Sequence, residues 1–169
     1  MEYILTSAQW MDHYETDAKY NIAETCCAPV SIEDLKEFSD DKSLSPLDLS
    51  VKLSYGSIRG SNRLRETLAN LYSAKASTPF SADNVLITAG AIQANFMLLY
   101  ALVGPGDHVI CHYPTYQQLY SVPESLGAEV SLWKSKEAEG WTLDVEELKG
   151  LIRPNTKLII IKYVLSVYE

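Results

Sequence analysis

Four consecutive residues near the middle of the chain, Gly90-Ala91-Ile92-Gln93, have the types and the position that suit the binding of an anion. They lie between an apolar run that predicts a strand, Val85–Thr88, and a run with helical periodicity. A glycine and a small residue let the backbone approach a ligand closely, and the first N–H groups of a helix have no partner within the helix. Since the helix dipole also favours negative charge at this end, a phosphate monoester fits the pattern. A tight turn without any ligand has the same local pattern and is the alternative interpretation.

Tyr116 is the second residue with a chemical interpretation, because it follows the predicted strand His108–Cys111 and starts the next predicted helix. The carboxyl ends of parallel strands meet at one edge of a sheet, so we expect Tyr116 at the same edge as Gly90. An aromatic face at this edge can stack on a planar heteroaromatic ring. The alternative is that Tyr113, Tyr116 and Tyr120 are half-buried residues packed against the sheet.

The other polar residues form no recognisable catalytic or metal-binding set. Three arginines lie where a helix is predicted to start, and we interpret them as a solvated face rather than as a carboxylate site: Arg59, Arg63 and Arg65. Three further residues lack the spacing of a metal site or a catalytic dyad: Asp12, His13 and His112.

Composition narrows the class of protein. The chain has 169 residues, enough for about one domain, and its net charge of −8 argues against a nucleic-acid partner. No run of apolar residues is long enough to predict a membrane span, and the first residues do not have the pattern of a secretory signal. The three cysteines are neither a disulfide framework nor a metal-binding pattern, which favours a reducing compartment. We therefore expect a cytoplasmic protein.

Strands and helices are predicted to alternate through the second half of the chain. The predicted helices start at Ser31 and Ser61, cover 91–103 and 115–126, and run from Asp144 to near Ile152. The predicted strands cover 85–88, 108–111, 128–133 and 158–161. This alternation predicts an α/β fold with a mostly parallel sheet and flanking helices.

Several segments occur in an order and at a spacing that resemble those of the class I/II aminotransferases, enzymes of pyridoxal-phosphate (PLP) fold type I. The segments are Tyr55-Gly56, Gly60, Leu64-Arg65, Ile87-Thr88-Ala89-Gly90-Ala91, Gly104-Pro105-Gly106-Asp107, Tyr113-Pro114-Thr115-Tyr116, Gly127-Ala128-Glu129-Val130 and Thr156-Lys157-Leu158-Ile159-Ile160. The resemblance implies that residues 55–169 form part of the large, PLP-binding domain. It assigns residues 1–54 to an N-terminal arm and a portion of the small domain.

The resemblance also implies an activity and the residues that bind PLP. The family transfers an amino group between an amino acid and a 2-oxo acid, as homodimers. The backbone N–H groups of Ala91 and Ile92, with Gly90 and Gln93 close by, are expected to hold the PLP phosphate. Tyr116 is expected to stack on the pyridine ring, and Tyr55 to reach the phosphate of the neighbouring subunit.

The sequence departs from the family after the last predicted strand. An Asn-Pro-rich loop follows that strand in the family, whereas Lys162 to Glu169 follow it here. Lys157 and Lys162 do not stand in the family's serine–lysine context. We therefore expect a truncated and inactive chain that lacks the Schiff-base lysine and binds PLP weakly. The alternatives are a non-catalytic dimerisation or interaction module and, if a full-length form exists, a PLP-dependent C–S lyase.

Overall fold

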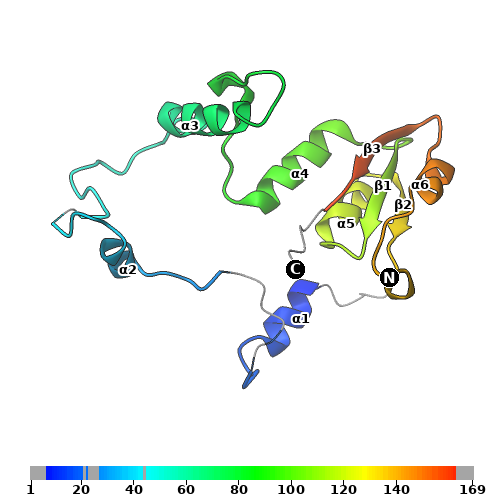
Figure 1. The fold of residues 1–169 in the computed structure, drawn as a ribbon, viewed down its shortest axis with the longest axis horizontal. Helices are drawn as coiled ribbons and strands as arrows, with labels where there is room; N and C mark the ends of the chain where they lie inside the picture. Colours follow the sequence, from blue (N-terminus) through cyan, green and yellow to red (C-terminus); the bar gives the residue numbers. More distant parts are fainter. Residues whose placement is uncertain (1–6, 21, 23–26, 44, 163–169) are drawn as a thin grey trace. The chain divides into compact units, whose positions relative to one another are not determined.

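The computed structural model describes residues 7–20, 22, 27–43 and 45–162 (Figure 1). The chain divides into two compact units, Met1–Ile58 and Arg59–Glu169. The assignment of residues 1–54 and 55–169 to parts of an aminotransferase stays a prediction.

The first unit contains two short helices, α1 (Ser7–Tyr14) and α2 (Ile32–Glu37). The predicted start of α2 is confirmed by a reciprocal cap. Ser31 Oγ accepts the Asp34 N–H at 3.0 Å, and an Asp34 carboxylate oxygen accepts the Ser31 N–H at 2.7 Å. These hydrogen bonds to Ser31 lower the pKa of the Asp34 carboxyl.

The second unit begins with helix α3 (Asn62–Ser73), which is followed by a short 3-10 helix, η1 (Ala82–Asn84). The helix predicted from Ser61 is confirmed, and Ser61 caps it, since its Oγ accepts the Leu64 N–H at 3.3 Å. Gly60, just before α3, has a φ of +92° and packs directly against the Ile87 side chain. This close approach holds the chain after η1 beside the start of α3.

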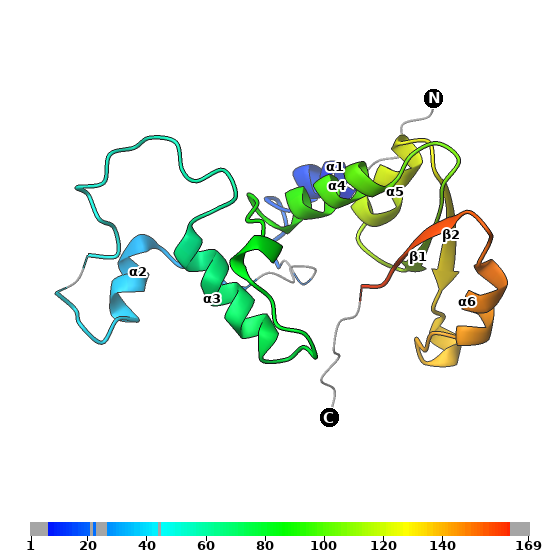
Figure 2. The same cartoon turned by 90° about the horizontal axis from the view of Figure 1, so that it is seen from above.

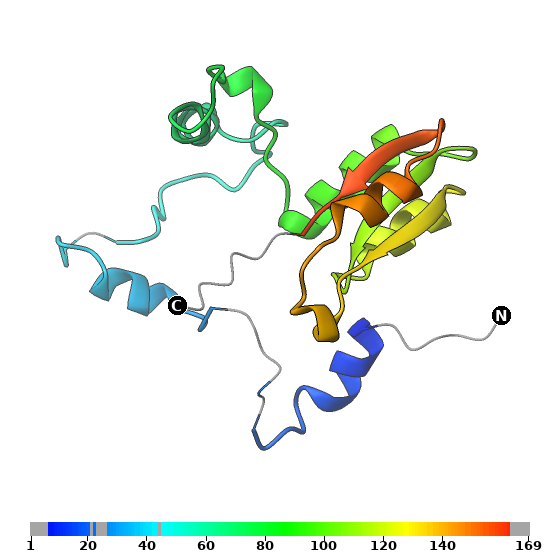
Figure 3. The ribbon, with the colours of Figure 1, turned by 45° about the vertical axis from the view of Figure 1, so that its right-hand side comes forward.

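A parallel sheet of three described strands forms the centre of the second unit, in the order β2-β1-β3. The strands are β1 (His108–Tyr113), β2 (Glu129–Lys134) and β3 (Thr156–Ile160). Helices α5 (Gln118–Ser125) and α6 (Val145–Leu151), with the short η2 (Glu137–Glu139), connect the strands. Helices α4 (Ala91–Leu102) and α5 lie on one face of the sheet and α6 lies on the other (Figures 1 to 3). The predicted α/β class with a parallel sheet and flanking helices is confirmed.

The core lies between this sheet and helices α4 and α5. Leu99 and Val103 from the end of α4 pack with Val109 of β1 and with Ala128, which precedes β2. The central strand is covered on both faces, and its residues 109–111 have no exposed surface. The apolar positions of α4 and β1 are therefore what holds this helix against the sheet.

A buried histidine joins the three strands where they begin. His108 has no exposed surface, and its Nδ1 and Nε2 lie 2.7 Å from Thr156 Oγ1 and 2.9 Å from Ser131 Oγ. The Arg153 backbone N–H donates to Thr156 Oγ1 at 2.7 Å, and its guanidinium pairs with Glu129 at 2.5 Å. Burial of the ring, followed by the charge of Arg153, lowers the pKa of His108, while Glu129 raises it.

Three expectations about these elements need correction. The predicted strand 85–88 is wrong, because this segment is extended but pairs with no strand among the described residues. Instead of pairing with a strand, the Ile87 N–H donates to the Arg59 carbonyl at 3.1 Å. Helix α5 starts at Gln118, later than the predicted 115. Asp144 caps α6 through the Glu146 N–H, so Glu147 takes no part in the cap.

Candidate functional site

The start of α4 offers unpaired hydrogen-bond donors. Gly90 precedes the helix with φ +83° and ψ 165°, a conformation that favours glycine, and no side chain caps the helix. The N–H groups of Ala91, Ile92 and Gln93 have no hydrogen-bond partner among the residues that the structure describes. Three N–H groups that point out of one helix end form a cradle for an anion, and the helix dipole adds to its positive potential.

The loop that leads into this cradle is closed by its own hydrogen bonds. Thr88 Oγ1 donates to the Gly90 carbonyl at 2.9 Å, and the Gly90 N–H donates to the Thr88 carbonyl, also at 2.9 Å. Gln93 Oε1 accepts the Ala89 N–H at 2.7 Å. The Gln93 side chain thus folds back onto the loop, which leaves the backbone N–H as the group of Gln93 that is open to an anion.

Hydrogen bonds tie the start of α5 to the first turn of α4. Gln118 Nε2 donates to the Ile92 carbonyl at 2.7 Å, and Asn95 Nδ2 lies 3.5 Å from Gln118 Oε1. Tyr116 lies two residues before Gln118, and its side chain is 44% exposed. Tyr116 thus lies two residues from a side chain that contacts the first turn of α4, and the stacking of its ring on a ligand stays a prediction.

The segment around Tyr116 has two more features. The rings of Tyr113 and Tyr120 pack edge to face with their centroids 6.2 Å apart, and burial raises the pKa of the Tyr120 hydroxyl. Thr115 Oγ1 is buried and has no hydrogen-bond partner among the described residues. The open N–H groups suit the oxygens of a phosphate ester, and a half-exposed aromatic ring suits a planar ring that the ester carries.

Tyr55 is the one expected cofactor-binding residue that does not belong to the second unit. It belongs to the first unit, lies outside any helix or strand, and has a fully exposed side chain. Its expected contact with a neighbouring subunit stays a prediction.

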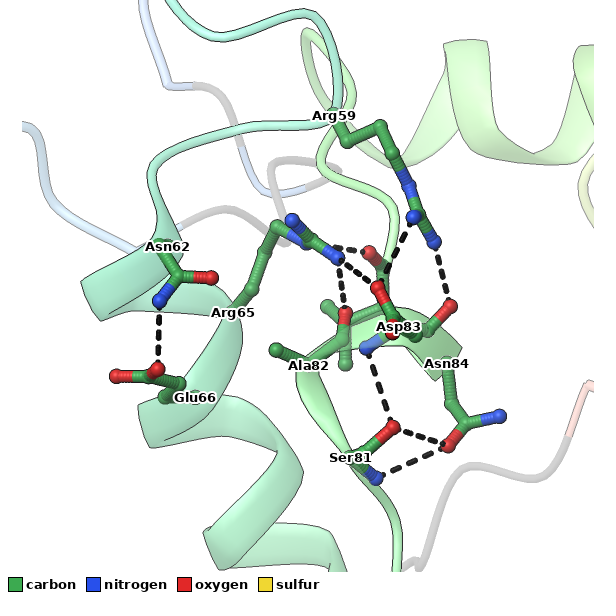
Figure 4. A network of polar contacts seen from close by, with 9 residues as sticks. Arg59, Asn62, Arg65, Glu66, Ser81, Ala82, Asp83 and Asn84 are labelled. Atoms are coloured by element: carbon green, nitrogen blue, oxygen red, sulfur yellow. Dashed lines mark hydrogen bonds and ion pairs between the residues drawn. The ribbon is translucent and has the colours of Figure 1, made fainter.

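The interpretation of the three arginines as a solvated face is wrong for Arg65. Its side chain is only 11% exposed, and its guanidinium donates to the Val85 carbonyl at 3.0 Å and the Ala82 carbonyl at 2.5 Å (Figure 4). It also pairs with Asp83 at 3.2 Å, and the half-exposed Arg59 reaches the same carboxylate at 3.1 Å. Arg63 is exposed, as expected.

The sequence did contain a signal for the burial of Arg65. Arg65 stands four residues before Ala69, which is buried, on the helix face that also carries Leu68 and Tyr72. With Phe80 and residues 84–87, these apolar side chains line a cavity of about 360 Å³ beside the arginine. No comparable sequence pattern indicates the contact of Gln118 with Ile92, because it depends on how α5 packs against α4.

Within residues 7–20, 22, 27–43 and 45–162, no three His, Cys, Asp or Glu side chains are grouped so that they could hold a metal ion. No helix among the described residues has the length and the apolar character needed to cross a membrane.

Comparisons with known proteins agree on one family. A model of the family described as aminotransferase class I and II matches residues 32–166. The aspartate aminotransferase of Sulfolobus acidocaldarius is 32% identical over 109 residues, which cover 63% of this chain and 27% of that protein.

Solved structures give the same result. A PLP-dependent aminotransferase from Streptococcus suis is 41% identical with a TM-score of 0.78, covering 90% of this chain and 40% of that one. Aspartate aminotransferase from Thermus thermophilus is 28% identical with a TM-score of 0.60, covering 64% of this chain and 28% of that one. The chain thus spans less than half the length of each of these relatives.

Proposed function

The chain belongs to the class I and II aminotransferases, and from this we propose that it forms the part of a PLP-dependent transaminase that holds the cofactor phosphate. The protein would transfer an amino group between an amino acid and a 2-oxo acid. The observation that carries the proposal is the set of three N–H groups at the start of α4 that have no partner among the described residues.

Each residue of the site has a proposed task. The N–H groups of Ala91, Ile92 and Gln93 donate to the phosphate oxygens, and the end of the helix stabilises their negative charge. Gly90 lets the chain turn into the helix at a positive φ. Tyr116 stacks on the pyridine ring, held near the cradle by Gln118. Bound PLP supplies an electron sink for the substrate's α-carbon, which no protein side chain provides.

We propose amino-group transfer rather than C–S bond cleavage as the reaction. The relatives described above carry the names of aminotransferases, which supports the first reaction over the second. A polypeptide of these 169 residues is expected to bind PLP weakly and to show no transamination by itself.

We also propose that the protein acts as a homodimer, in which Tyr55 reaches the phosphate bound by a second copy. Three large apolar side chains close to Tyr55 in the sequence are exposed, and we assign them to this interface: Val51, Leu53 and Ile58.

The phosphate site can be tested by removing one of its three N–H donors. Proline is tolerated at the first position of a helix, so Ala91→Pro removes one N–H while keeping the helix. A hydrogen bond to a charged group is worth about 1.5–3 kcal/mol. The variant should therefore bind PLP at least about tenfold more weakly. Quenching of tryptophan fluorescence by PLP, with inorganic phosphate as competitor, measures the affinity.

The matched control makes the same change at another helix. Asn62→Pro also places proline at a first helical position, at the start of α3, and should leave the affinity for PLP unchanged. Equal affinities of the wild-type chain and Ala91→Pro would refute the proposed phosphate site.

A further inference from the structure

The segment that leads into the phosphate cradle is held by hydrogen bonds from an arginine side chain instead of by pairing with a strand. Residues 85–88 are extended and pair with no strand among the described residues. The Val85 carbonyl has the Nε–H of Arg65 as its partner, at 3.0 Å. The same guanidinium holds the Ala82 carbonyl through Nη2, at 2.5 Å. Arg65 therefore fixes both ends of the short stretch from η1 to Val85 (Figure 4).

Two more contacts extend this support to Ile87. The Ile87 N–H donates to the Arg59 carbonyl at 3.1 Å, and the Ile87 side chain packs against Gly60. Arg59 in turn pairs with Asp83, the carboxylate that Arg65 also contacts. Residues at and just before the start of α3 thus hold the chain as far as Ile87, the residue before Thr88.

The cradle has two independent supports as a result. From the helix side, Leu99 and Val103 anchor α4 against the sheet. From the loop side, Arg65 holds Ala82 and Val85, and the Arg59 carbonyl and Gly60 hold Ile87, the residue before Thr88. Without the second support, the loop 88–90 would be fixed at its helix end only.

On the basis of this geometry we infer that Arg65 is a positioning residue for phosphate binding, acting through residues 82–87 on the loop that leads into α4. The inference rests on the proposed function, because it assumes that the cradle binds a phosphate. Arg65 itself does not touch the ligand. Misplacement of a binding group by about 1 Å can cost up to about a hundredfold in function. Loss of Arg65 should therefore weaken phosphate binding by about tenfold or more.

The test follows individual backbone amides of the full chain. A ¹⁵N-labelled sample is titrated with inorganic phosphate, and the NMR signals of Ala91, Ile92 and Gln93 report binding. Arg65→Met keeps an unbranched apolar side chain in place of the arginine stem but removes every donor. The signals of residues 109–111 in the central strand show whether the sheet is intact. We expect the phosphate dissociation constant to rise about tenfold or more while these strand signals stay unchanged.

Two further variants make the result specific. Arg63→Met changes an arginine on the same helix whose side chain makes no hydrogen bond or ion pair among the described residues, and it should bind phosphate as the wild type does. Arg65→Lys keeps the charge, but a single ammonium lacks the planar fork that holds two carbonyls at once, and it should weaken binding to an intermediate degree.

The outcomes separate this inference from the function on which it rests. If phosphate does not shift the amides of Ala91–Gln93 in the wild-type chain, the proposed function fails. If the wild type binds and both Arg65 variants bind equally well, the inference is overturned. If the strand signals disappear in Arg65→Met, its sheet is no longer intact, and the result for Arg65→Lys decides whether the inference holds. Weaker binding with an intact sheet supports the positioning role, and unchanged binding overturns it.

Discussion

At the scale of the residue, His108 combines complete burial with hydrogen bonds to two neighbouring strands. Its hydroxyl partners, Ser131 and Thr156, suit a neutral ring, and the charged groups beside it are Arg153 and Glu129. Burial lowers the pKa of His108 below its value in the unfolded chain. Protonation of the His108 ring should therefore destabilise the folded state.

This shift predicts how stability depends on pH. Above an unfolded pKa of about 6.5 the ring is neutral in both states, and its contribution is fully present. As the pH falls from 7 to 5, the unfolded chain binds a proton that the folded chain resists. The free energy of unfolding should then decrease by up to about 1.4 kcal/mol per pH unit. Urea unfolding at pH 7, 6 and 5 measures it.

The matched variant is His108→Gln, which keeps a hydrogen-bonding side chain but cannot titrate. Its free energy of unfolding should change less over the same range. Glu129, whose pKa is lowered first by its hydrogen bond to Arg153, adds acid sensitivity only at lower pH, near and below the ordinary range of a carboxyl. An identical pH dependence in the wild type and His108→Gln would contradict the role given to His108.

At the scale of the element, the contact between Gly60 and Ile87 predicts a large effect of one methyl group. A Cβ at position 60 would lie 2.4 Å from Ile87 Cγ1, at a φ of +92° that other residues rarely adopt. Backbone strain of about 1–2 kcal/mol and overpacking of about 1–3 kcal/mol act together. Gly60→Ala should therefore lower the free energy of unfolding by about 2–5 kcal/mol in a denaturant titration.

Gly150 provides a control in which the same substitution should raise the free energy of unfolding instead of lowering it. It lies in α6, no atom lies within 4 Å of a Cβ placed there, and its φ is not positive. Alanine is a better helix former than glycine by about 0.8–1 kcal/mol, so Gly150→Ala should stabilise the chain slightly. Similar effects of the two substitutions would show that the contact with Ile87 is not tight in solution.

The elements also show what the sequence could and could not predict. Helix starts at Ser31 and Ser61 were predictable, because a cap is a local interaction within three residues. The central strand was predictable because its apolar run is buried on both faces. The segment 85–88 has an equally apolar sequence, but a strand needs a neighbour, and sequence alone does not show whether one is present.

The candidate site likewise has one part that the sequence could predict and another that it could not. The cradle at Gly90–Gln93 depends on neighbouring residues in one turn, so its local pattern was visible in the sequence. Arg65 and Gln118 act on residues 20 and 26 positions away, and no local pattern reports such contacts.

At the scale of the whole molecule, two cysteines can show how well the folded state protects its interior, because one is exposed and the other is buried. Cys27 is exposed, whereas Cys111 is buried in the central strand, and burial raises the pKa of its thiol to about 11. Because only the thiolate reacts, iodoacetamide at pH 8 should modify Cys27 at least about a hundredfold faster than Cys111. Mass spectrometry of the digested protein after timed labelling measures both rates.

Denaturant supplies the control for this comparison. In urea the protection of Cys111 should vanish together with the folded state, so its labelling rate should approach that of Cys27. Rapid labelling of Cys111 in the native protein would show that the sheet opens far more often than its packing suggests.

The strand order β2-β1-β3 has a consequence for biosynthesis. The middle strand is made before either of its neighbours: β1 begins at His108, while β3 begins at Thr156. At a translation rate of roughly 5–20 residues per second, β3 follows roughly 2–10 seconds later. β2 is made within this interval, but until β3 follows, the buried central strand lacks one of its two neighbours. On the ribosome, β1 is therefore the segment that a chaperone has most reason to bind.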